Sequence, residues 1–191
     1  TEEKRGIVSY QPLGVIYSIQ PWNFPFYQVA RFAAPNIMVG NTLLIKHASI
    51  VPQCAIAIEA LFIEAGAPSG LYTNLLISGK AASKLVADNR IKGVSLTGSE
   101  KAGASVAEQA GKSLKKSVLE LGGSDAFIVL EDADIDKTVE WAVTGRINNN
   151  GECCIASKRF IAVEEIADEF FEKFKNKLVN IYIKFSYLYF N

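Results

Sequence analysis

Two adjacent cysteines, Cys153 and Cys154, follow three asparagines, a glycine and a glutamate in the stretch NNNGECCIAS. A thiol behind a glycine turn can reach solvent and backbone N–H donors, which favours the nucleophilic thiolate. A lone cysteine is more commonly buried as a small apolar side chain. The pair therefore has four interpretations: buried packing, a disulfide, a metal site, or a nucleophile with a neighbour.

Covalent geometry and the supply of ligands weigh against two of these interpretations. The Cα atoms of adjacent residues lie about 3.8 Å apart, which is below the usual range for a disulfide. The same strain argues against a thiol redox module built on the pair. The sequence has no C-x-x-C motif, and its single histidine, His47, lies far from the cysteines along the chain. A zinc site would need ligands that this sequence hardly offers.

Two further side chains, Glu120 and Asn23, could complete a site for acyl transfer. Glu120 ends an apolar stretch just before two glycines, where partial loss of water suits a carboxylate to general-base work. The commoner alternative is a solvated glutamate at the end of a strand. The amide of Asn23 is a suitable hydrogen-bond donor for an oxyanion. A thiol, a carboxylate base and an amide donor together fit acyl transfer.

These side chains must be positioned by an alternation of strands and helices. We expect strands at residues 13–19, 41–46, 72–77, 91–97, 115–121, 126–130 and 159–163, and helices at residues 52–66, 81–88, 99–109, 135–146 and 167–179. The segment QPWNFP contains two prolines and is expected to be a rigid loop. Strands that alternate with helices predict βαβ units, and therefore an α/β fold with a doubly wound parallel sheet.

In such sheets, ligands bind beyond the carboxyl ends of the strands. The polar residues at these ends are Trp22 and Asn23, Lys46, Gly98 and Ser99, and Glu120. Lys46 could neutralise a phosphate, or it could be a surface lysine at the end of the sheet. Ser99 opens a helix whose first N–H groups could bind a pyrophosphate, or it serves only as the N-cap. The sequence has no G-x-G-x-x-G motif, so nucleotide binding would need a variant loop.

The composition favours a globular protein that acts on small molecules. Hydrophobic residues make up 49% of the 191 residues, which is enough to bury a core, and 20 basic residues balance 20 acidic ones. This balance gives no reason to expect a nucleic-acid or membrane partner. The three cysteines, and a start, TEEKRG, without an apolar run, favour the reducing cytoplasm.

Both ends of the chain suggest a piece of a longer protein. The chain starts at Thr1, and its only methionine is Met38. Residues 181–191, IYIKFSYLYFN, are rich in aromatic side chains and lack helical spacing. They are too few for a membrane span, which takes about twenty residues. We expect them to be a truncated or altered end.

Five motifs occur together along the chain: PWNFP, NTLLIK, LTGSEKAG, LELGG and NNGECC. Their order and intervals resemble those of the NAD(P)-dependent aldehyde dehydrogenase superfamily, over residues 5–180. The resemblance implies a variant Rossmann cofactor-binding domain at residues 1–122, incomplete at its N-terminus. It further implies the start of a second α/β catalytic domain at residues 123–180, followed by an atypical tail. The full-length form would be more than twice as long and would form a homo-oligomer.

The resemblance also implies roles for the candidate catalytic residues. The family's N-x-G-Q-x-C motif aligns with NNGECC, so Cys154 is the implied nucleophile and Cys153 takes the variable position. Glu120 of LELGG matches the general base. Asn23 of PWNFP matches the oxyanion donor, which acts together with the backbone N–H of Cys154. Glu152 replaces the motif's usual glutamine and adds a charge near the thiol.

The implied cofactor is NAD or NADP, and no metal is implied. Trp22 is placed among the cofactor-binding residues, Lys46 and Ser49 match positions around the adenosine ribose, and Gly98 and Ser99 match the phosphate-binding turn. Relatives restricted to NAD often carry a glutamate where Ser49 stands. A neutral serine removes the repulsion toward a 2′-phosphate, so we expect NADP to be accepted as well.

The implied reaction is the oxidation of an aldehyde to a carboxylic acid. Cys154 attacks the aldehyde, hydride passes to the nicotinamide, and Glu120 activates the water that hydrolyses the resulting thioester. The stretches GVIYSIQPWNFPFYQVARF and LELGGSDAFIVLEDADID further resemble the bacterial branch that oxidises succinate semialdehyde to succinate. The alternative is a truncated, catalytically inactive remnant that at most binds nucleotide.

Overall fold

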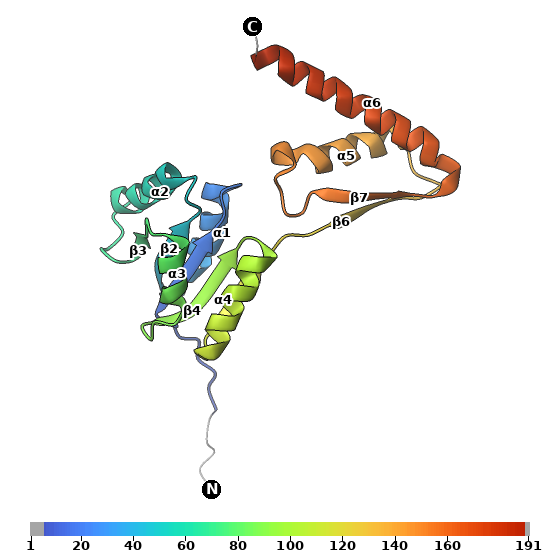
Figure 1. The fold of residues 1–191 in the computed structure, drawn as a ribbon. Coiled ribbons are helices and arrows are strands. Elements are labelled where there is room, and N and C mark those ends of the chain that lie inside the picture. The colour runs from blue at the N-terminus through green and yellow to red at the C-terminus, as the bar shows by residue number, and fades with distance from the viewer. Residues whose placement is uncertain (1–5, 190–191) are drawn as a thin grey trace. The chain divides into compact units, whose positions relative to one another are not determined.

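The chain folds into two compact units, residues 1–121 and 122–191, each with its own apolar core (Figure 1). The computed structural model describes the backbone of residues 6–189 and the side chains of residues 6–181. The boundary between the units falls inside the LELGG motif, between Leu121 and Gly122. That the first unit binds the cofactor and the second performs catalysis remains a prediction.

The first unit is built on a five-stranded sheet with the strand order β3-β2-β1-β4-β5. The strands are β1 (Val15–Gln20), β2 (Thr42–His47), β3 (Tyr72–Asn74), β4 (Ile91–Thr97) and β5 (Lys116–Glu120). All neighbouring strands are parallel, and the order reverses at β1, which lies between β2 and β4. The predicted α/β class with a doubly wound parallel sheet is confirmed.

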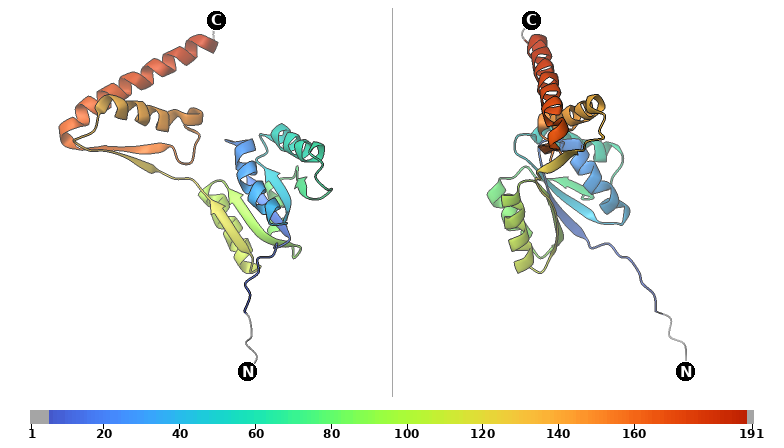
Figure 2. Two further views of the ribbon diagram at one scale, coloured as in Figure 1. Left: turned by 180° about the vertical axis from the view of Figure 1, so that it is seen from behind. Right: turned by 90° about the vertical axis from the view of Figure 1, so that its right-hand side faces the viewer.

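Helices cover both faces of this sheet (Figure 2). They are α1 (Pro25–Met38), α2 (Pro52–Glu64), α3 (Gly79–Val86) and α4 (Glu100–Lys112). Val29 of α1 packs with Ile16 in one buried cluster, and Val106 of α4 packs with Tyr17 in another. Ile16 and Tyr17 are neighbours on β1 whose side chains point to opposite faces. Burial on both faces is what a parallel sheet requires.

Local sequence signals explain where these helices begin. Pro25 and Pro52 stand in the first turns of α1 and α2, where a fixed φ and a missing N–H cause no loss of hydrogen bonding. Ser78 and Ser99 cap α3 and α4, and each hydroxyl oxygen accepts a hydrogen bond of 3.3 Å from the N–H three residues on. The four helices therefore start at positions that the chain itself marks.

Three predictions about these elements are wrong. The sequence predicts only a rigid loop at QPWNFP, yet Pro25 of that segment starts α1, which continues through Pro35 near its end. The predicted strand at residues 72–77 stops at Asn74, because β3 is an edge strand that pairs with β2 alone. Helix α4 passes the expected stop at Gly111, and Leu114 takes up the left-handed conformation instead, with φ of 53°.

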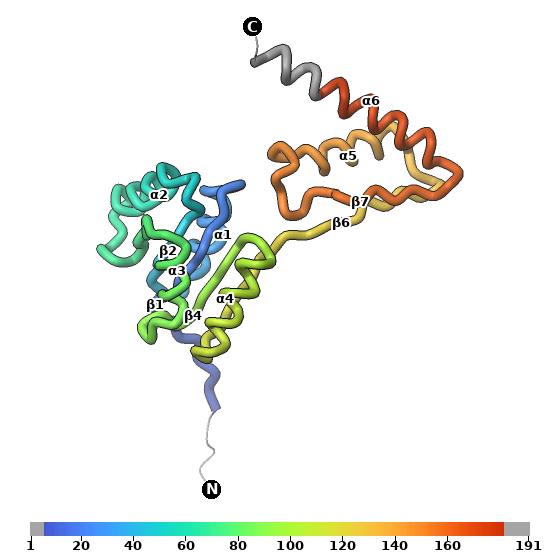
Figure 3. Tube along the Cα trace, in the orientation of Figure 1, coloured from blue at the N-terminus to red at the C-terminus, as the bar shows by residue number. Residues whose placement is uncertain are grey.

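The second unit is a pair of parallel strands packed against two helices (Figure 3). Its elements in chain order are β6 (Asp125–Val129), α5 (Ile135–Ile147), a short 3₁₀ turn (Asn148–Gly151), β7 (Ser157–Ala162) and α6 (Glu164–Tyr189). Val129, Ala142 and Phe170 are fully buried in its core. Ile128 and Ile161 pair in register on the opposite face of the strands and are 64% and 48% exposed.

Helix α6 extends past the predicted end at residue 179 and continues to Tyr189. Residues 181–191 lack helical spacing, but they contain neither glycine nor proline. An existing helix therefore gains one hydrogen bond for each residue it adds there. Residues 190 and 191 lie outside the described part of the chain. Within residues 6–189, no helix is long and apolar enough to cross a membrane.

His47 gives the first unit a pH-dependent stability. Its imidazole is buried at the end of β2, with Nε2 3.1 Å from the carbonyl oxygen of Pro25. Burial, together with the nearby charge of Lys46, lowers the pKa of His47 below its ordinary value of 6.5. The unfolded chain therefore takes up a proton at a higher pH than the folded unit does. The stability that depends on neutral His47 is present above about pH 6.5 and is lost as the pH falls.

This dependence can be measured by urea unfolding at about pH 7.5 and about pH 5.5. The chain has two tryptophans, so a Trp141→Phe background makes Trp22 the fluorescent reporter of the first unit. We expect the unfolding midpoint to fall at the lower pH, and to fall less when His47→Gln is added. An equal fall in both proteins would contradict a role of His47.

Candidate active site

The predicted site residues of the first unit all lie at the end of the sheet where its parallel strands terminate. They are Trp22 and Asn23 after β1, Lys46 and Ser49 at the end of β2, Gly98 and Ser99 after β4, and Glu120 at the end of β5. Glu120 pairs in register with Thr97, and its carbonyl oxygen accepts a hydrogen bond of 2.9 Å from the N–H of Gly98. Because the carboxyl ends of parallel strands lie on the same side of a sheet, residues far apart in the sequence are brought together here.

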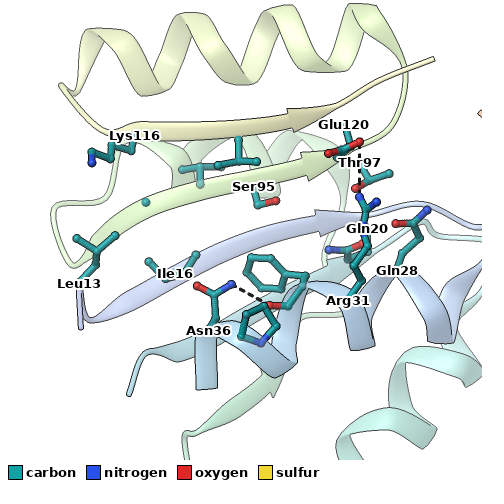
Figure 4. Close-up of a pocket in the computed structure, with 15 residues that line it drawn as sticks. Leu13, Ile16, Gln20, Gln28, Arg31, Asn36, Ser95, Thr97, Lys116 and Glu120 are labelled. Carbon is teal, nitrogen blue, oxygen red and sulfur yellow. Dashed lines mark hydrogen bonds and ion pairs between the residues drawn. The ribbon is translucent and has the colours of Figure 1, made fainter. Parts of the chain in front are cut away.

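A cavity of about 330 Å³ opens between α1 and the strands β1, β4 and β5 (Figure 4). The polar residues at its carboxyl end are Gln20, Gln28, Arg31, Thr97 and Glu120. The apolar part of its wall comes from Leu13, Ile16, Phe32, Pro35 and Val118. A concave site with an apolar wall and a few converging polar groups is the usual setting for a small ligand.

Arg31 and Glu120 form an ion pair in this cavity. The guanidinium Nη2 of Arg31 lies 3.6 Å from Oε2 of Glu120, and the side chains are 45% and 53% exposed. The expected partial loss of water at Glu120 is therefore wrong for this structure, and the alternative of a solvated glutamate at the end of a strand holds. A solvent-exposed pair at this distance contributes little to stability. An anionic ligand can therefore compete with Glu120 for Arg31.

Two buried glutamines, Gln20 and Gln28, line the same end of the cavity. In the part of the chain that the structure describes, their side-chain oxygens have no hydrogen-bond partner. The amide of Gln20 donates a hydrogen bond of 2.7 Å to the hydroxyl of Ser18. Buried polar atoms usually have a partner, so these two oxygens are exceptions among the described residues.

Sequence reasoning missed Arg31 and Gln28. Both lie on α1, the helix that was not predicted, and they are three residues apart, so they share one face of it. The useful signal was the pair of polar residues in the otherwise apolar stretch FYQVARF after PWNFP. It has meaning only once that stretch is assigned to a helix.

A second cavity, of about 300 Å³, lies beyond the ends of β2 and β3. It is lined by His47, Ala48, Ser49, Pro52, Leu75, Leu76, Ile77 and Ser78. Lys46, the residue before this wall, is only 9% exposed, and burial lowers its pKa. The alternative of a surface lysine is therefore wrong. Phosphate binding by Lys46 remains a prediction.

For the turn after β4, the structure directly supports the interpretation of Ser99 as an N-cap. Ser99 is the N-cap of α4, as its hydrogen bond to the N–H of Ala102 shows. A cap of this kind does not exclude an anion, because the other N–H groups of the first turn remain directed out of the helix. Phosphate binding at Gly98 and Ser99 stays a prediction.

The two cysteines lie in a turn of the second unit that begins with three left-handed residues. Asn149, Asn150 and Gly151 have φ values of 50°, 57° and 77°. Asparagine tolerates this conformation better than most residues, and glycine adopts it freely. Cys153 and Cys154 follow and are both partly exposed. Neither is a core residue, so a reagent can reach both thiols.

Gly123, the second glycine of the LELGG motif, passes close to this turn. A Cβ atom on Gly123 would lie 3.3 Å from the carbonyl oxygen of Cys154, which is closer than most Cβ contacts. The absence of a side chain at residue 123 thus allows the two segments to approach. Asn23 and Glu120 belong to the first unit and Cys154 to the second. Their action as one catalytic set remains a prediction.

Comparison with known proteins identifies the family. Residues 1–185 match the aldehyde dehydrogenase family. The chain belongs to this family. The resemblance carried by the five motifs is therefore confirmed, and the chain is homologous to NAD(P)-dependent aldehyde dehydrogenases.

The relatives of this aldehyde dehydrogenase chain include bacterial succinate-semialdehyde dehydrogenases. A probable NADP+ enzyme of this name from Synechocystis is 58% identical over 173 residues, covering 91% of the chain. The NADP+ enzyme from Deinococcus radiodurans is 57% identical over 163 residues, covering 85%. The chain spans 38% and 34% of the lengths of these two relatives. This agrees with the expectation of a piece of a longer protein.

Solved structures give the same result for the fold. The succinic semialdehyde dehydrogenase of Streptococcus pyogenes, in complex with NADP+, is 52% identical with a TM-score of 0.83. The match covers 86% of the chain and 36% of that structure. The succinate-semialdehyde dehydrogenase of Burkholderia pseudomallei is 34% identical with a TM-score of 0.86, over 89% and 36% of the two chains. The aldehyde dehydrogenase fold is confirmed.

Proposed function

We propose that the chain is the cofactor-binding and nucleophile-bearing part of an NADP-dependent succinate-semialdehyde dehydrogenase. The observation that supports the assignment of the substrate is Arg31, a half-exposed cation at the polar end of the cavity that Glu120 also lines. Succinate semialdehyde has an aldehyde at one end and a carboxylate at the other. An arginine near the candidate base is suited to bind that carboxylate. The names of the relatives agree with this substrate.

The proposed chemistry begins at Cys154. Its thiolate adds to the aldehyde carbon, and the oxyanion accepts hydrogen bonds from the amide of Asn23 and the backbone N–H of Cys154. When bound, NADP+ supplies the hydride acceptor. The product of oxidation is a thioester on Cys154. Glu120 then takes a proton from a water molecule, which attacks the thioester and releases succinate and the free thiol.

The cofactor is held in this proposal by the end of β2. The ammonium of Lys46 and the hydroxyl of Ser49 bind the adenosine ribose and its 2′-phosphate, Trp22 lies along the cofactor, and the turn at Gly98 and Ser99 binds the pyrophosphate. The burial of Lys46 supports an anion at this place. A thiol that must stay reduced for catalysis is suited to the cytoplasm, where we place the enzyme.

The test is the production of NADPH or NADH by a full-length form, measured across a small panel of aldehydes with both cofactors. We expect the highest kcat/KM with succinate semialdehyde and NADP+. A higher value with a neutral aldehyde of similar length, such as butanal, would overturn the substrate. A higher kcat/KM with NAD+ would overturn the proposed cofactor preference but would not affect the proposed substrate.

Replacing Arg31 by glutamine is expected to raise the KM for succinate semialdehyde by about 10- to 100-fold, since a charge-assisted hydrogen bond contributes about 1.5–3 kcal/mol. The KM for butanal should stay within about threefold, because that substrate has no carboxylate to lose its partner. The KM of Arg31→Lys for succinate semialdehyde should lie between those of the parent enzyme and Arg31→Gln. Arg90→Gln, at an exposed ion pair with Asp88, is the matched control. Equal losses for both aldehydes in Arg31→Gln would contradict substrate binding by Arg31.

Replacing Ser49 by glutamate is expected to lower the ratio of kcat/KM for NADP+ over NAD+ by about 100-fold. A carboxylate there repels the 2′-phosphate and accepts hydrogen bonds from a free 2′-hydroxyl. Ala104→Glu adds the same charge at an exposed position on α4 and should leave the ratio unchanged. An unchanged ratio in Ser49→Glu would place the ribose elsewhere.

A second candidate function is nucleotide binding without turnover by the chain as it stands. Its support is that the chain spans 38% of the length of its Synechocystis relative. Titration of the 191-residue chain with NADPH, together with an assay of aldehyde oxidation, separates the two functions. Binding without oxidation supports this candidate, and oxidation rules it out. Reading the encoding DNA beyond the codon for Ile181 would show whether the remaining motifs of the family follow.

A further inference from the structure

Lys158, near the start of β7, donates its side-chain hydrogen bonds to the backbone of the cysteine turn. Its Nζ lies 3.4 Å from the carbonyl oxygen of Cys153, and 3.1 Å from the carbonyl oxygens of both Cys154 and Ala156. An ammonium group has three N–H donors. Three carbonyl acceptors within four residues can therefore occupy all of them, although most surface lysines keep their ammonium in water.

These contacts fix the direction of the peptide groups on both sides of Cys154. Residues 6–189 contain no cis peptide bond, and in a trans peptide the C=O and the N–H point in opposite directions. The carbonyls of Cys153 and Cys154 point toward Nζ of Lys158. The N–H groups of Cys154 and Ile155, which belong to the same two peptide groups, must then point away from it. Successive N–H groups on one side of a turn form a favourable place for an anion.

Between the 3₁₀ turn and β7, the segment that holds Cys153 and Cys154 belongs to no helix or strand. The cysteine turn begins with the left-handed residues Asn149, Asn150 and Gly151. Its backbone hydrogen bonds run from the N–H of Glu152 to the carbonyl oxygen of Asn149, at 2.9 Å, and from the N–H of Ala156 to that of Cys153, at 3.1 Å. Backbone carbonyls outside a helix or sheet need other donors, and Lys158 provides them. Lys158 thus adds contacts from β7 to the backbone hydrogen bonds of the turn.

We propose that Lys158 is a positioning residue for the nucleophile turn. By holding the carbonyls of Cys153 and Cys154, it directs the N–H of Cys154 toward the oxyanion that forms when the Cys154 thiolate adds to a carbonyl carbon. This inference rests on the proposed function of Cys154. Lys158 itself touches neither substrate nor cofactor and acts through the backbone.

The test uses the 191-residue chain and three variants. Lys158→Met removes the donors, Lys158→Arg keeps donors of similar reach, and Lys175→Met is the control, at an exposed ion pair of α6 with Glu172. Hydrogen–deuterium exchange is followed on a peptide that contains residues 153–157. Alkylation of Cys153 and Cys154 by iodoacetamide is followed on the same peptide by mass spectrometry, and circular dichroism reports the fold.

The N–H of Ala156 is hydrogen-bonded to the carbonyl oxygen that Lys158 also contacts, so we expect Lys158→Met to speed its exchange in this peptide by about tenfold. We also expect the ratio of Cys154 to Cys153 alkylation to fall by about fivefold. Lys158→Arg and Lys175→Met should stay within about twofold of the parent chain. Parent-like exchange in a folded Lys158→Met chain would overturn the proposal. If Lys158→Met does not fold, Lys158→Arg decides: parent-like exchange supports the proposal, and fast exchange in a folded chain overturns it. Equal alkylation of both cysteines in the parent chain would count against Cys154 as nucleophile, while the exchange data would still test Lys158.

Discussion

Replacing Cys154 by alanine is expected to lower aldehyde oxidation by a full-length form by on the order of 10⁴-fold or more, because the covalent route through the thioester is lost. Cys154 is partly exposed in a turn beside Gly123, where a substrate can approach its thiol. The binding of NADPH should be unchanged, since Lys46 and Ser49 belong to the other unit. The assay is the absorbance of NADPH formed from succinate semialdehyde, combined with a fluorescence titration of NADPH.

Cys153→Ala is the matched control for this experiment. It removes the adjacent thiol, which is exposed to a similar degree, and should lower the rate by less than about tenfold. Oxidation that survived in Cys154→Ala and disappeared in Cys153→Ala would move the nucleophile to Cys153. Survival in both single variants would end the thioester mechanism.

Replacing Glu120 by glutamine is expected to slow steady-state oxidation by about 10²- to 10⁴-fold, because general-base activation of the hydrolytic water is lost. Cys154 should still react, so a rapid first turnover should form about one NADPH per active site before the slow phase begins. The glutamine also ends the ion pair with Arg31, which lies 3.6 Å away. The measurement is a stopped-flow record of NADPH formation with succinate semialdehyde in excess.

Glu108→Gln controls for the loss of a carboxylate from the first unit. Glu108 is exposed on α4 and pairs with Lys112 at 2.6 Å, so its replacement should leave both phases unchanged. A Glu120→Gln enzyme that lost the first turnover as well as the steady rate would show that Glu120 acts before the thioester forms. An enzyme with a normal steady rate would remove Glu120 from the mechanism.

The sheet of the first unit was predictable because its central strands β1, β2 and β4 are largely apolar runs between turn residues. The predicted strand at residues 91–97 has the same bounds as β4. Helix α1 was not predictable in the same way, because the two prolines of QPWNFP, Pro21 and Pro25, favour a rigid loop in the sequence. Pro25 stands in the first turn, where proline is tolerated, and that position is known only when the helix is known. Pro35 lies inside the helix, where proline removes a backbone hydrogen bond.

The candidate site was predictable to the extent that its residues lie in motifs. Glu120, Asn23, Lys46 and Ser49 could be named from the chain, and they lie at the ends of strands as expected. Arg31 could not be named, because its place beside Glu120 depends on α1. The contacts of Lys158 depend on the path of a turn that opens with left-handed residues, and the order of residues alone does not specify such a path.

The reversal of strand order at β1 separates two kinds of selectivity. The cavity with Arg31 lies on the side of β4 and β5, and the cavity with Ser49 follows β2 and β3, on the other side of β1. Residues that do not share partners usually contribute additively to free energy. Under the proposed function, mutation and selection can therefore alter the choice of cofactor without disturbing the choice of aldehyde.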